Sequence, residues 1–209
     1  MAKLDELKVA VEKGKAKLVP GLVQATLDEG TAPADALNAM IDSMGVVGEN
    51  FKNGTIFVPE MLIAAKAMKK GVEVLKPLLA SGEAGAKGKV IIGTVAGDLH
   101  DIGKNLVAMM IESTGFEVID LGVDVPVEKF VEAANEEGVK IVACSALLTT
   151  TMPALKDTVT AINAAAWRGN VKVMVGGAPI TQEFADKVGA DAYTPDAASA
   201  AKKAKELVA

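Results

Sequence analysis

The spacing of apolar residues changes once along the chain, and this change limits the available folds more than any other feature. Between residues 3 and 79 apolar residues recur at intervals of three and four, which is the spacing of helices that bury one side. The pattern is interrupted at Gly14, at residues 30–33, at residues 52–54 and at Pro77. We therefore expect residues 1–80 to form a small antiparallel four-helix bundle, with Pro33 and Pro59 in the first turns of two helices.

After residue 88 the pattern changes to short runs rich in β-branched residues, separated by segments long enough for helices. These runs cover residues 89–95, 116–120, 139–144, 171–175 and, more weakly, 191–193. Alternating strands and helices predict a parallel sheet with helices on both faces, most commonly in the flavodoxin-like strand order 2-1-3-4-5. The expected α/β protein has a helical cap at residues 1–80, a linker of small residues at 81–88, and a five-stranded flavodoxin-like, Rossmann-type domain at 89–209.

The composition removes several classes of function. The 209 residues include one histidine, His100, and one cysteine, Cys144, which excludes a zinc cluster and an internal disulfide. A net charge of −5 and only 3% aromatic residues argue against a nucleic-acid partner, which needs clustered Lys and Arg. The amino terminus lacks a signal-peptide apolar core, and no run approaches the ~18 apolar residues of a membrane span. We therefore expect a soluble, cytoplasmic protein without a membrane partner.

The candidate functional residues lie in two loops. In sheets of this kind ligands bind beyond the carboxyl ends of the strands, in the crevice between strands 1 and 3 where the order reverses. The loop after the first strand contains Asp98 and His100, and the loop after the third contains the hydroxyls of residues 149–151. An imidazole held by a carboxylate suits a general base or a metal ligand. From these residues alone both roles stay open, as does a solvated or structural histidine.

Two neighbouring side chains have simpler interpretations. Cys144 ends an apolar strand and is expected to be buried and unreactive. Lys104 and Asn105 begin the helix after His100 and are expected to contact only water.

A motif in three parts, one in each of three loops, resembles the signature of cobalamin-binding domains. The parts are Asp98-x-His100-x-x-Gly103, Ser145-x-Leu147 and Gly176-Gly177. The chain is similar, over nearly its whole length, to the cobalamin-binding module of methionine synthase and to the corrinoid proteins of methylotrophic methyltransferases. Those proteins also carry a cap of four helices before the flavodoxin-like domain, and residues 53–61 look like the family's approach to the last cap helix.

The resemblance implies cobalamin as the cofactor, in its methylcobalamin and cob(I)alamin forms, with His100 as the lower ligand of cobalt in place of the dimethylbenzimidazole base. Asp98 would accept a hydrogen bond from the other ring nitrogen, and alignment places the third member of this relay at Thr151, where methionine synthase has serine. The three residues Asp98, His100 and Thr151 would act together during methyl transfer. The implied cofactor contacts are Gly97, Asp98, Leu99, His100, Asp101, Ile102, Gly103, Ser145, Leu147, Thr149, Gly176 and Gly177, with Phe57 and Met61 above the corrin.

The resemblance further implies a corrinoid methyl carrier. A barrel that binds a methyl donor or acceptor needs about 250 residues, so we expect a component of a methyltransferase system rather than a complete enzyme. The implied partners are a substrate-specific methyltransferase, an acceptor methyltransferase that uses tetrahydrofolate or coenzyme M, and a reductive activase. Methanol, methylamines, betaines and aryl methyl ethers are all donors within the family. The cap is expected to swing aside on the linker during transfer.

Three other interpretations stay open on the sequence. The small subunit of an adenosylcobalamin mutase shares the motif around His100 but gives no reason for a helical cap. A cobalamin-based light sensor would have a similar cap and sheet, and would also need a DNA-binding domain. A signalling or scaffold domain without a cofactor could use the same fold.

Overall fold

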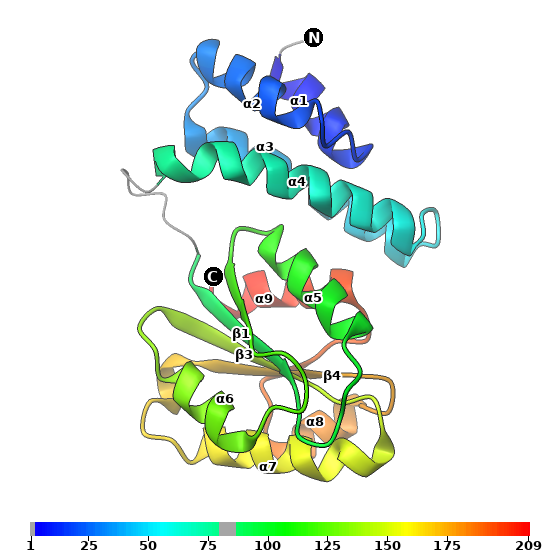
Figure 1. Ribbon diagram of the computed structural model, residues 1–209, viewed down its shortest axis with the longest axis vertical. Helices are drawn as coiled ribbons and strands as arrows, with labels where there is room; N and C mark the ends of the chain where they lie inside the picture. The colour runs from blue at the N-terminus through cyan, green and yellow to red at the C-terminus, as the bar shows by residue number, and fades with distance from the viewer. Residues whose placement is uncertain (1–2, 80–86) are drawn as a thin grey trace. The chain divides into compact units, whose positions relative to one another are not determined.

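The computed structural model describes residues 3–79 and 87–209, which divide into two compact units (Figure 1). The first unit contains helices α1 (Lys3–Glu12), α2 (Val19–Asp28), α3 (Pro33–Lys52) and α4 (Val58–Leu79). The second unit contains the sheet and the helices that follow. Except for residues 87 and 88, the linker expected at 81–88 lies outside the described residues.

Within the first unit the helices pack around aliphatic and methionine side chains. Helix α3 packs against α1 and α4, and α2 packs against the same two helices. Gly71 of α4 permits a close approach, because a Cβ atom there would lie 2.5 Å from Met40 Sδ of α3 and 2.9 Å from Val19 Cγ1 of α2. The fully buried side chains of this unit include Leu7, Val11, Val23, Met40, Met68 and Leu75. The helical cap predicted from the apolar spacing is confirmed.

The prolines of the first unit differ in their effect on the helices. Pro33 is the first residue of α3 and Pro59 the second of α4, where a missing N–H group costs no helical hydrogen bond. The interruption predicted at Pro77 is wrong, because α4 continues to Leu79. Pro77 removes only the hydrogen bond to the carbonyl four residues earlier, and the loss falls on the last turn, where the helix is about to end.

The second unit contains a five-stranded parallel sheet in the order β2-β1-β3-β4-β5. The strands are β1 (Lys89–Thr94), β2 (Glu117–Asp120), β3 (Val139–Ser145), β4 (Lys172–Gly176) and β5 (Ala192–Tyr193). The residues of β1 and β3 are almost all buried, because these strands lie inside the sheet and helices cover both faces. The flavodoxin-like strand order predicted from the sequence is therefore confirmed.

Five helices cover the two faces of this sheet (Figure 1). On one face lie α5 (Ile102–Glu112) and α9 (Ala197–Leu207), which pack against each other. On the other lie α6 (Val127–Ala134), α7 (Met152–Asn163) and α8 (Gln182–Val188). Two 3-10 helices, η1 (Thr149–Thr151) and η2 (Arg168–Asn170), flank α7. The arrangement is doubly wound, with each strand followed by a helix.

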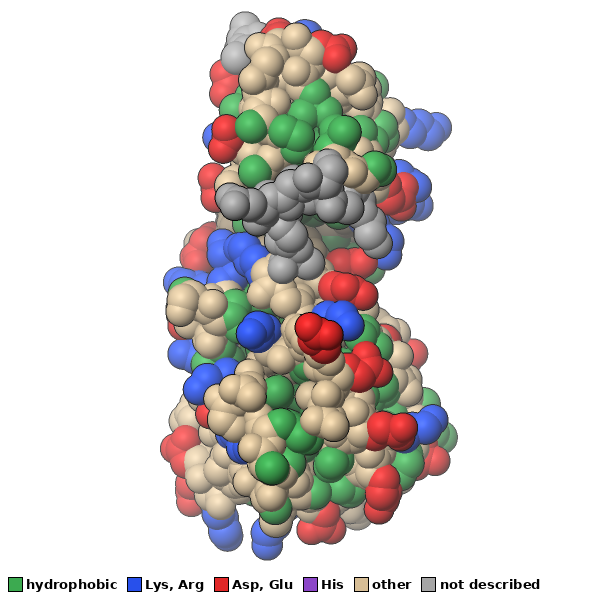
Figure 2. Space-filling view, turned by 90° about the vertical axis from the view of Figure 1, so that its left-hand side faces the viewer, with side chains coloured by type: hydrophobic (Ala, Val, Ile, Leu, Met, Phe, Trp, Pro, Cys, Tyr) green, Lys and Arg blue, Asp and Glu red, His purple; other side chains and the backbone are tan. Residues whose placement is uncertain are grey.

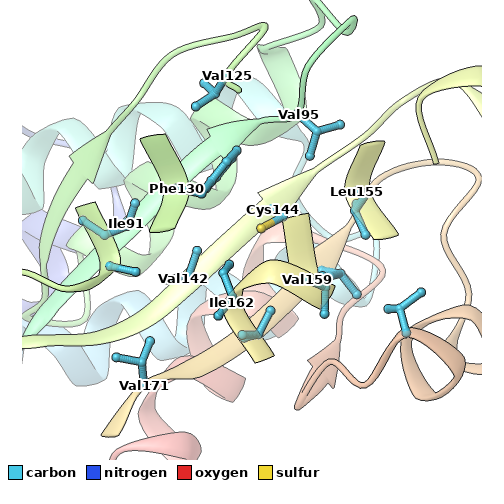
Figure 3. Packing of buried hydrophobic residues seen from close by; sticks show 14 of the residues in the cluster. Ile91, Val95, Val125, Phe130, Val142, Cys144, Leu155, Val159, Ile162 and Val171 are labelled. Carbon is cyan, nitrogen blue, oxygen red and sulfur yellow. The ribbon is translucent and has the colours of Figure 1, made fainter. Parts of the chain in front are cut away.

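One apolar core of the second unit lies between the sheet and α6, α7 and α8 (Figure 3). Val142 and Cys144 of β3 point into it and meet side chains such as Phe130 of α6 and Leu155 of α7. Cys144 is 2% exposed, and burial raises the pKa of its thiol to about 12. Cys144 is therefore an unreactive core residue, as the sequence predicted.

Figure 2 shows one face of the molecule, on which acidic and basic side chains are interspersed with hydrophobic ones. Within residues 3–79 and 87–209, each helix is too short or too polar to cross a membrane.

Candidate functional site

Three loops leave the sheet side by side at its carboxyl edge. Thr94 at the end of β1 pairs with Ser145 at the end of β3, and Ser145 pairs with Gly176 at the end of β4. Strands β1 and β3 are neighbours although β2 lies between them in the sequence, so the strand order reverses between their loops. These two loops meet at the side chain of Asp98.

The carboxylate of Asp98 is fully buried and joins the two loops by hydrogen bonds. Its Oδ1 atom accepts from Nδ1 of His100 at 2.7 Å and from the His100 backbone N–H at 3.1 Å. Its Oδ2 atom accepts from Oγ1 of Thr151 at 2.8 Å and from the Leu147 N–H at 2.7 Å, with the Leu148 N–H at 3.4 Å. Both carboxylate oxygens are thus satisfied without water, as a buried charge requires.

These donors decide the charge of Asp98. Burial alone would raise the pKa of this carboxyl, because the charged form loses its hydration. The hydrogen bonds from the Leu147 N–H, from the ring and backbone of His100 and from the Thr151 hydroxyl act in the opposite direction and prevail. They hold the pKa of Asp98 well below its usual range, so the buried side chain is ionised at neutral pH.

His100 presents one ring nitrogen to Asp98 and has a side chain that is 50% exposed. Because an ionised carboxylate only accepts hydrogen bonds, Nδ1 carries a proton, and in the neutral ring Nε2 then holds the lone pair. The backbone of His100 is also held, since its carbonyl oxygen accepts a hydrogen bond from the buried Thr94 hydroxyl at 2.9 Å. The result is an oriented imidazole in the tautomer that binds a metal through Nε2.

Thr151 lies at the end of η1 and is 5% exposed. Its Oγ1 atom lies 2.8 Å from Asp98 Oδ2 and 2.9 Å from the carbonyl oxygen of Leu148. A hydroxyl has a single proton to donate, and the charged carboxylate is the stronger acceptor. Thr151, Asp98 and His100 therefore form a continuous hydrogen-bonded chain from a buried hydroxyl to an exposed imidazole.

Exposed apolar side chains flank this chain of hydrogen bonds. Leu99 is 71% and Ile102 79% exposed, and Leu147 and Leu148, whose N–H groups point to Asp98, are 40% and 41% exposed. Several large apolar side chains that are exposed together indicate a surface that a ligand or partner covers. The remaining polar residues of the motif are accessible to a ligand, since Asp101 and Thr149 are exposed and Ser145 is half-buried.

The glycines of the motif are required for different reasons. Gly177 has a φ of +132°, and a Cβ atom there would lie 1.8 Å from the Ala146 carbonyl oxygen, so the fold itself requires glycine. Gly97 has a φ of +79° in the turn before Asp98. Gly103, by contrast, lies in α5 without a positive φ, and a Cβ atom there would meet no atom within 4 Å. Neither backbone nor packing requires glycine at 103, which leaves open space after His100.

The two cofactor contacts predicted above the corrin belong to the first unit. Phe57 precedes α4 and is 67% exposed, whereas Met61 lies within α4 and is 1% exposed. Only Phe57 therefore offers its side chain to a ligand in this structure. The role of both residues as cofactor contacts stays a prediction.

The prediction that Lys104 and Asn105 contact only water is wrong for both, since the Asn105 amide donates to Oδ2 of Asp101 at 3.1 Å and Lys104 is buried. Its side chain is 2% exposed, and Nζ pairs with Oδ2 of Asp120 at the end of β2 and with Oδ1 of Asn105. Lys104 lies on the side of α5 that packs over the sheet, where an ammonium group needs a carboxylate partner. This pair ties the start of α5, four residues after His100, to β2.

Sequence reasoning also missed Thr94 and Asp124, which hold the backbone of the His100 loop. Oδ1 of Asp124 accepts a hydrogen bond from the Gly97 N–H at 2.7 Å, and the Asp124 N–H donates to the Asp98 carbonyl oxygen at 3.0 Å. A signal for Asp124 was present, since it is the acidic residue of the otherwise apolar and glycine-containing turn that follows Asp120 at the end of the second strand.

Comparisons with known proteins agree with the motif. One B12 binding domain family matches residues 88–202, and a second matches residues 3–76. Dimethylamine corrinoid protein 1 of Methanosarcina acetivorans is 45% identical over 208 residues, which are 99% of this chain and 92% of that protein. A corrinoid protein of Desulfitobacterium hafniense is 40% identical, with 100% of this chain and 98% of that protein covered.

Solved structures show the same fold at similar identity. A cobalamin-binding protein from Desulfitobacterium hafniense has a TM-score of 0.82 and 33% identity, and covers 99% of this chain and 98% of its own. In the methanol:cobalamin methyltransferase complex from Methanosarcina barkeri the match has a TM-score of 0.84 and 31% identity, over 99% of this chain and 79% of that one. The chain therefore belongs to the family of methyltransferase-associated corrinoid proteins, in which a helical cap is joined to a flavodoxin-like B12 binding domain.

Proposed function

We propose that this chain is a corrinoid methyl carrier of the cytoplasm. It accepts a methyl group on cobalt from a substrate-specific methyltransferase and delivers it to a second methyltransferase, whose acceptor is tetrahydrofolate or coenzyme M. The observation that carries the proposal is the hydrogen-bonded chain from Thr151 through Asp98 to an exposed His100. A reductive activase is the further partner that we propose.

The residues at the carboxyl edge of the sheet fit cobalamin. The His100 ring is held at Nδ1, so that Nε2 is free among the described residues to serve as an axial nitrogen ligand. The exposed side chains of Leu99, Ile102 and Leu147 would offer apolar contacts to the face of a corrin ring. The open space at Gly103 would leave room for the nucleotide tail of a bound cobalamin.

When bound, cobalamin supplies the cobalt centre that takes up and releases a methyl group. The chain would hold the cobalt through His100 Nε2, and Asp98 fixes which nitrogen of that ring carries the proton. Ionised Asp98 accepts the Nδ1 proton of the ring across a 2.7 Å contact, which keeps Nε2 as the nitrogen that would face a metal. The hydrogen bond from Thr151 helps to keep the buried carboxylate of Asp98 charged. Through Asp98 it would influence how strongly His100 Nε2 binds a metal.

The relatives support a methylamine as the methyl donor. Proteins from three Methanosarcina species that match 79–99% of this chain are described as dimethylamine corrinoid proteins. The monomethylamine corrinoid protein of Methanosarcina barkeri is 36% identical, with a TM-score of 0.56. The mutase subunit and the light sensor gain no support from these relatives. We therefore propose dimethylamine or a related methylamine, rather than methanol, as the source of the methyl group.

Gel filtration tests whether the chain binds a corrinoid, which is the first requirement of a methyl carrier. Apo-protein mixed with excess hydroxocobalamin should retain about one corrinoid per chain through the column, measured by its visible absorbance. A matched sample without protein shows where free corrinoid elutes. A colourless protein peak that keeps a helical circular dichroism spectrum would contradict the proposal. The loaded protein, reduced to Co(I) with a chemical reductant, is then reconstituted with methylamine or methanol methyltransferases and their substrates, and we expect cobalt methylation with the methylamine enzymes only.

A further inference from the structure

The segment between β2 and α6 holds the loop that carries His100, although it contains none of the relay residues. Within it, Asp124 makes two hydrogen bonds to the backbone next to the relay. We propose that Asp124 is a positioning residue for the His100 ring. The inference rests on the function proposed above insofar as His100 is the lower ligand of the cofactor.

The two hydrogen bonds attach on either side of the Asp98 Cα atom. Oδ1 of Asp124 accepts from the Gly97 N–H at 2.7 Å, and the N–H of Asp124 donates to the Asp98 carbonyl oxygen at 3.0 Å. The side chain of Asp98 is held from the opposite loop by Leu147 and Thr151. Asp124 therefore fixes the backbone from which the Asp98 carboxylate reaches His100.

The backbone at Asp124 indicates that its side chain is needed. Asp124 has a φ of +52° and, over residues 3–79 and 87–209, is the one non-glycine residue with a positive φ. Glycine adopts this conformation more easily, as Gly122 does at +89° in the same turn. Glycine has no acceptor, however, and could not bind the Gly97 N–H. The turn thus keeps an unfavourable backbone conformation together with the side chain that reaches the His100 loop.

Asp124 can act as a positioning residue because its own place is fixed by the sheet. The Thr94 N–H donates to the Gly122 carbonyl oxygen, and the Val125 N–H donates to the Thr94 carbonyl oxygen, each at 3.0 Å. Val125 also forms a parallel bridge with Val95. The turn after β2 therefore continues its pairing with β1. Because the turn is fixed to the sheet in this way, the hydrogen bonds of Asp124 also hold the loop before His100 in place relative to the sheet.

Two substitutions separate the acceptor from the backbone conformation. Asp124→Gly keeps the positive φ and removes the acceptor. Asp124→Asn keeps both, because asparagine tolerates this region and its Oδ1 atom can accept from Gly97. Asn163→Ala serves as the control, since it removes side-chain hydrogen bonds to the carbonyls of Val188, the last residue of α8, and of Gly189, the next residue, which do not belong to the His100 loop.

The first readout needs no cobalamin. The chain has one histidine, so ¹⁵N-histidine labels His100 alone, and NMR reports which ring nitrogen carries the proton. In the wild type we expect the Nδ1–H tautomer. Losing one hydrogen bond should lower the ratio of positioned to displaced ring by about fivefold, so Asp124→Gly should shift the spectrum towards the Nε2–H tautomer that free histidine prefers. Asp124→Asn and Asn163→Ala should keep the wild-type ring spectrum.

The second readout uses the same ¹⁵N-histidine label after loading with natural-abundance hydroxocobalamin and reduction to Co(II). In the paramagnetic resonance spectrum a ¹⁵N doublet reports His100 and a ¹⁴N triplet reports another nitrogen, so the doublet fraction should fall in Asp124→Gly and be preserved in Asp124→Asn. The proposal is overturned if Asp124→Gly keeps the wild-type ring spectrum, or if Asp124→Asn loses the tautomer as completely as glycine does. The NMR measurement is made on apo-protein and tests the role of Asp124 by itself. A failure to bind cobalamin would contradict the proposed function without affecting that test.

Discussion

Thr151 Oγ1 and Asp98 Oδ2 belong to residues 53 positions apart in the sequence and lie 2.8 Å from each other. The contact closes the crevice between the loops after β1 and β3 with a hydroxyl that is almost fully buried. Asp98 can keep its charge in this place only because the donors around it replace water. The tautomer and orientation of the His100 ring therefore depend on the loop after β3 as well as on its own loop.

Removing the Thr151 hydroxyl tests this dependence. Thr151→Val keeps the shape of the side chain and leaves the Asp98 carboxylate with one donor fewer. We expect the free energy of unfolding of the apo-protein to fall by about 1–3 kcal/mol, the cost of a buried group left partly unsatisfied. Urea denaturation followed by circular dichroism measures the change. Thr151→Ser keeps the hydroxyl and should recover most of the loss; equal stability of the valine variant and the wild type would contradict the role of this bond.

The depressed pKa of Asp98 predicts how stability depends on pH. The carboxyl is ionised in the folded protein well below the ordinary value of 3.8 at which it titrates when unfolded. Its contribution to stability is therefore fully present above that value and is lost as the pH falls through it towards the lower folded pKa. Asp98→Asn should be less stable at neutral pH and should lose less stability between about pH 5 and pH 3. Apo-protein melting temperatures across this range measure both slopes, and parallel slopes would argue against an ionised Asp98.

The sequence predicts more of the fold than of the support around the site. The strand order follows from the alternation of β-branched runs and helices, and it alone places His100 beside the loop after β3. The choice of Thr151 among three consecutive threonines required alignment to a family, because each of them offers a hydroxyl.

Lys104 and Asp124 show why the remaining contacts were not predicted. The burial of Lys104 depends on Asp120, which is 16 residues away and faces it only once α5 lies on the sheet. The contact of Asp124 with Gly97 depends on a positive φ at Asp124, which residue propensities do not predict for a particular aspartate. Both contacts depend on the tertiary fold, because the local sequence pattern predicts secondary structure but not which partner a polar side chain contacts.

Gly103 tests whether the open space after His100 belongs to the ligand. A Cβ atom in Gly103→Ala would meet no atom within 4 Å, and the residue lies in the first turn of α5, so we expect the apo-protein to gain about 0.4–1 kcal/mol. If the open space at Gly103 serves the cofactor, as proposed, cobalamin affinity should fall in the same variant, because the methyl group would enter that space. Melting temperature and a binding titration measure the two effects.

The control for that prediction is Gly21→Ala. Gly21 also lies in the first turn of a helix, α2, and a Cβ atom added there would have no neighbour within 4 Å. The substitution should give a similar gain in stability and leave cobalamin binding unchanged. Unchanged binding in both variants would mean that the space at Gly103 does not serve the cofactor.

The most direct measurement exploits the single histidine of the chain. Protein labelled with ¹⁵N-histidine is loaded with natural-abundance hydroxocobalamin and reduced to Co(II), and the nitrogen splitting in its paramagnetic resonance spectrum is recorded. If His100 Nε2 is the axial ligand, labelling converts each triplet from ¹⁴N into a doublet from ¹⁵N, and His100→Ala abolishes the doublet. A triplet that survives labelling would show that another nitrogen, such as the cofactor's own base, occupies the axial position, and would contradict the role assigned to His100.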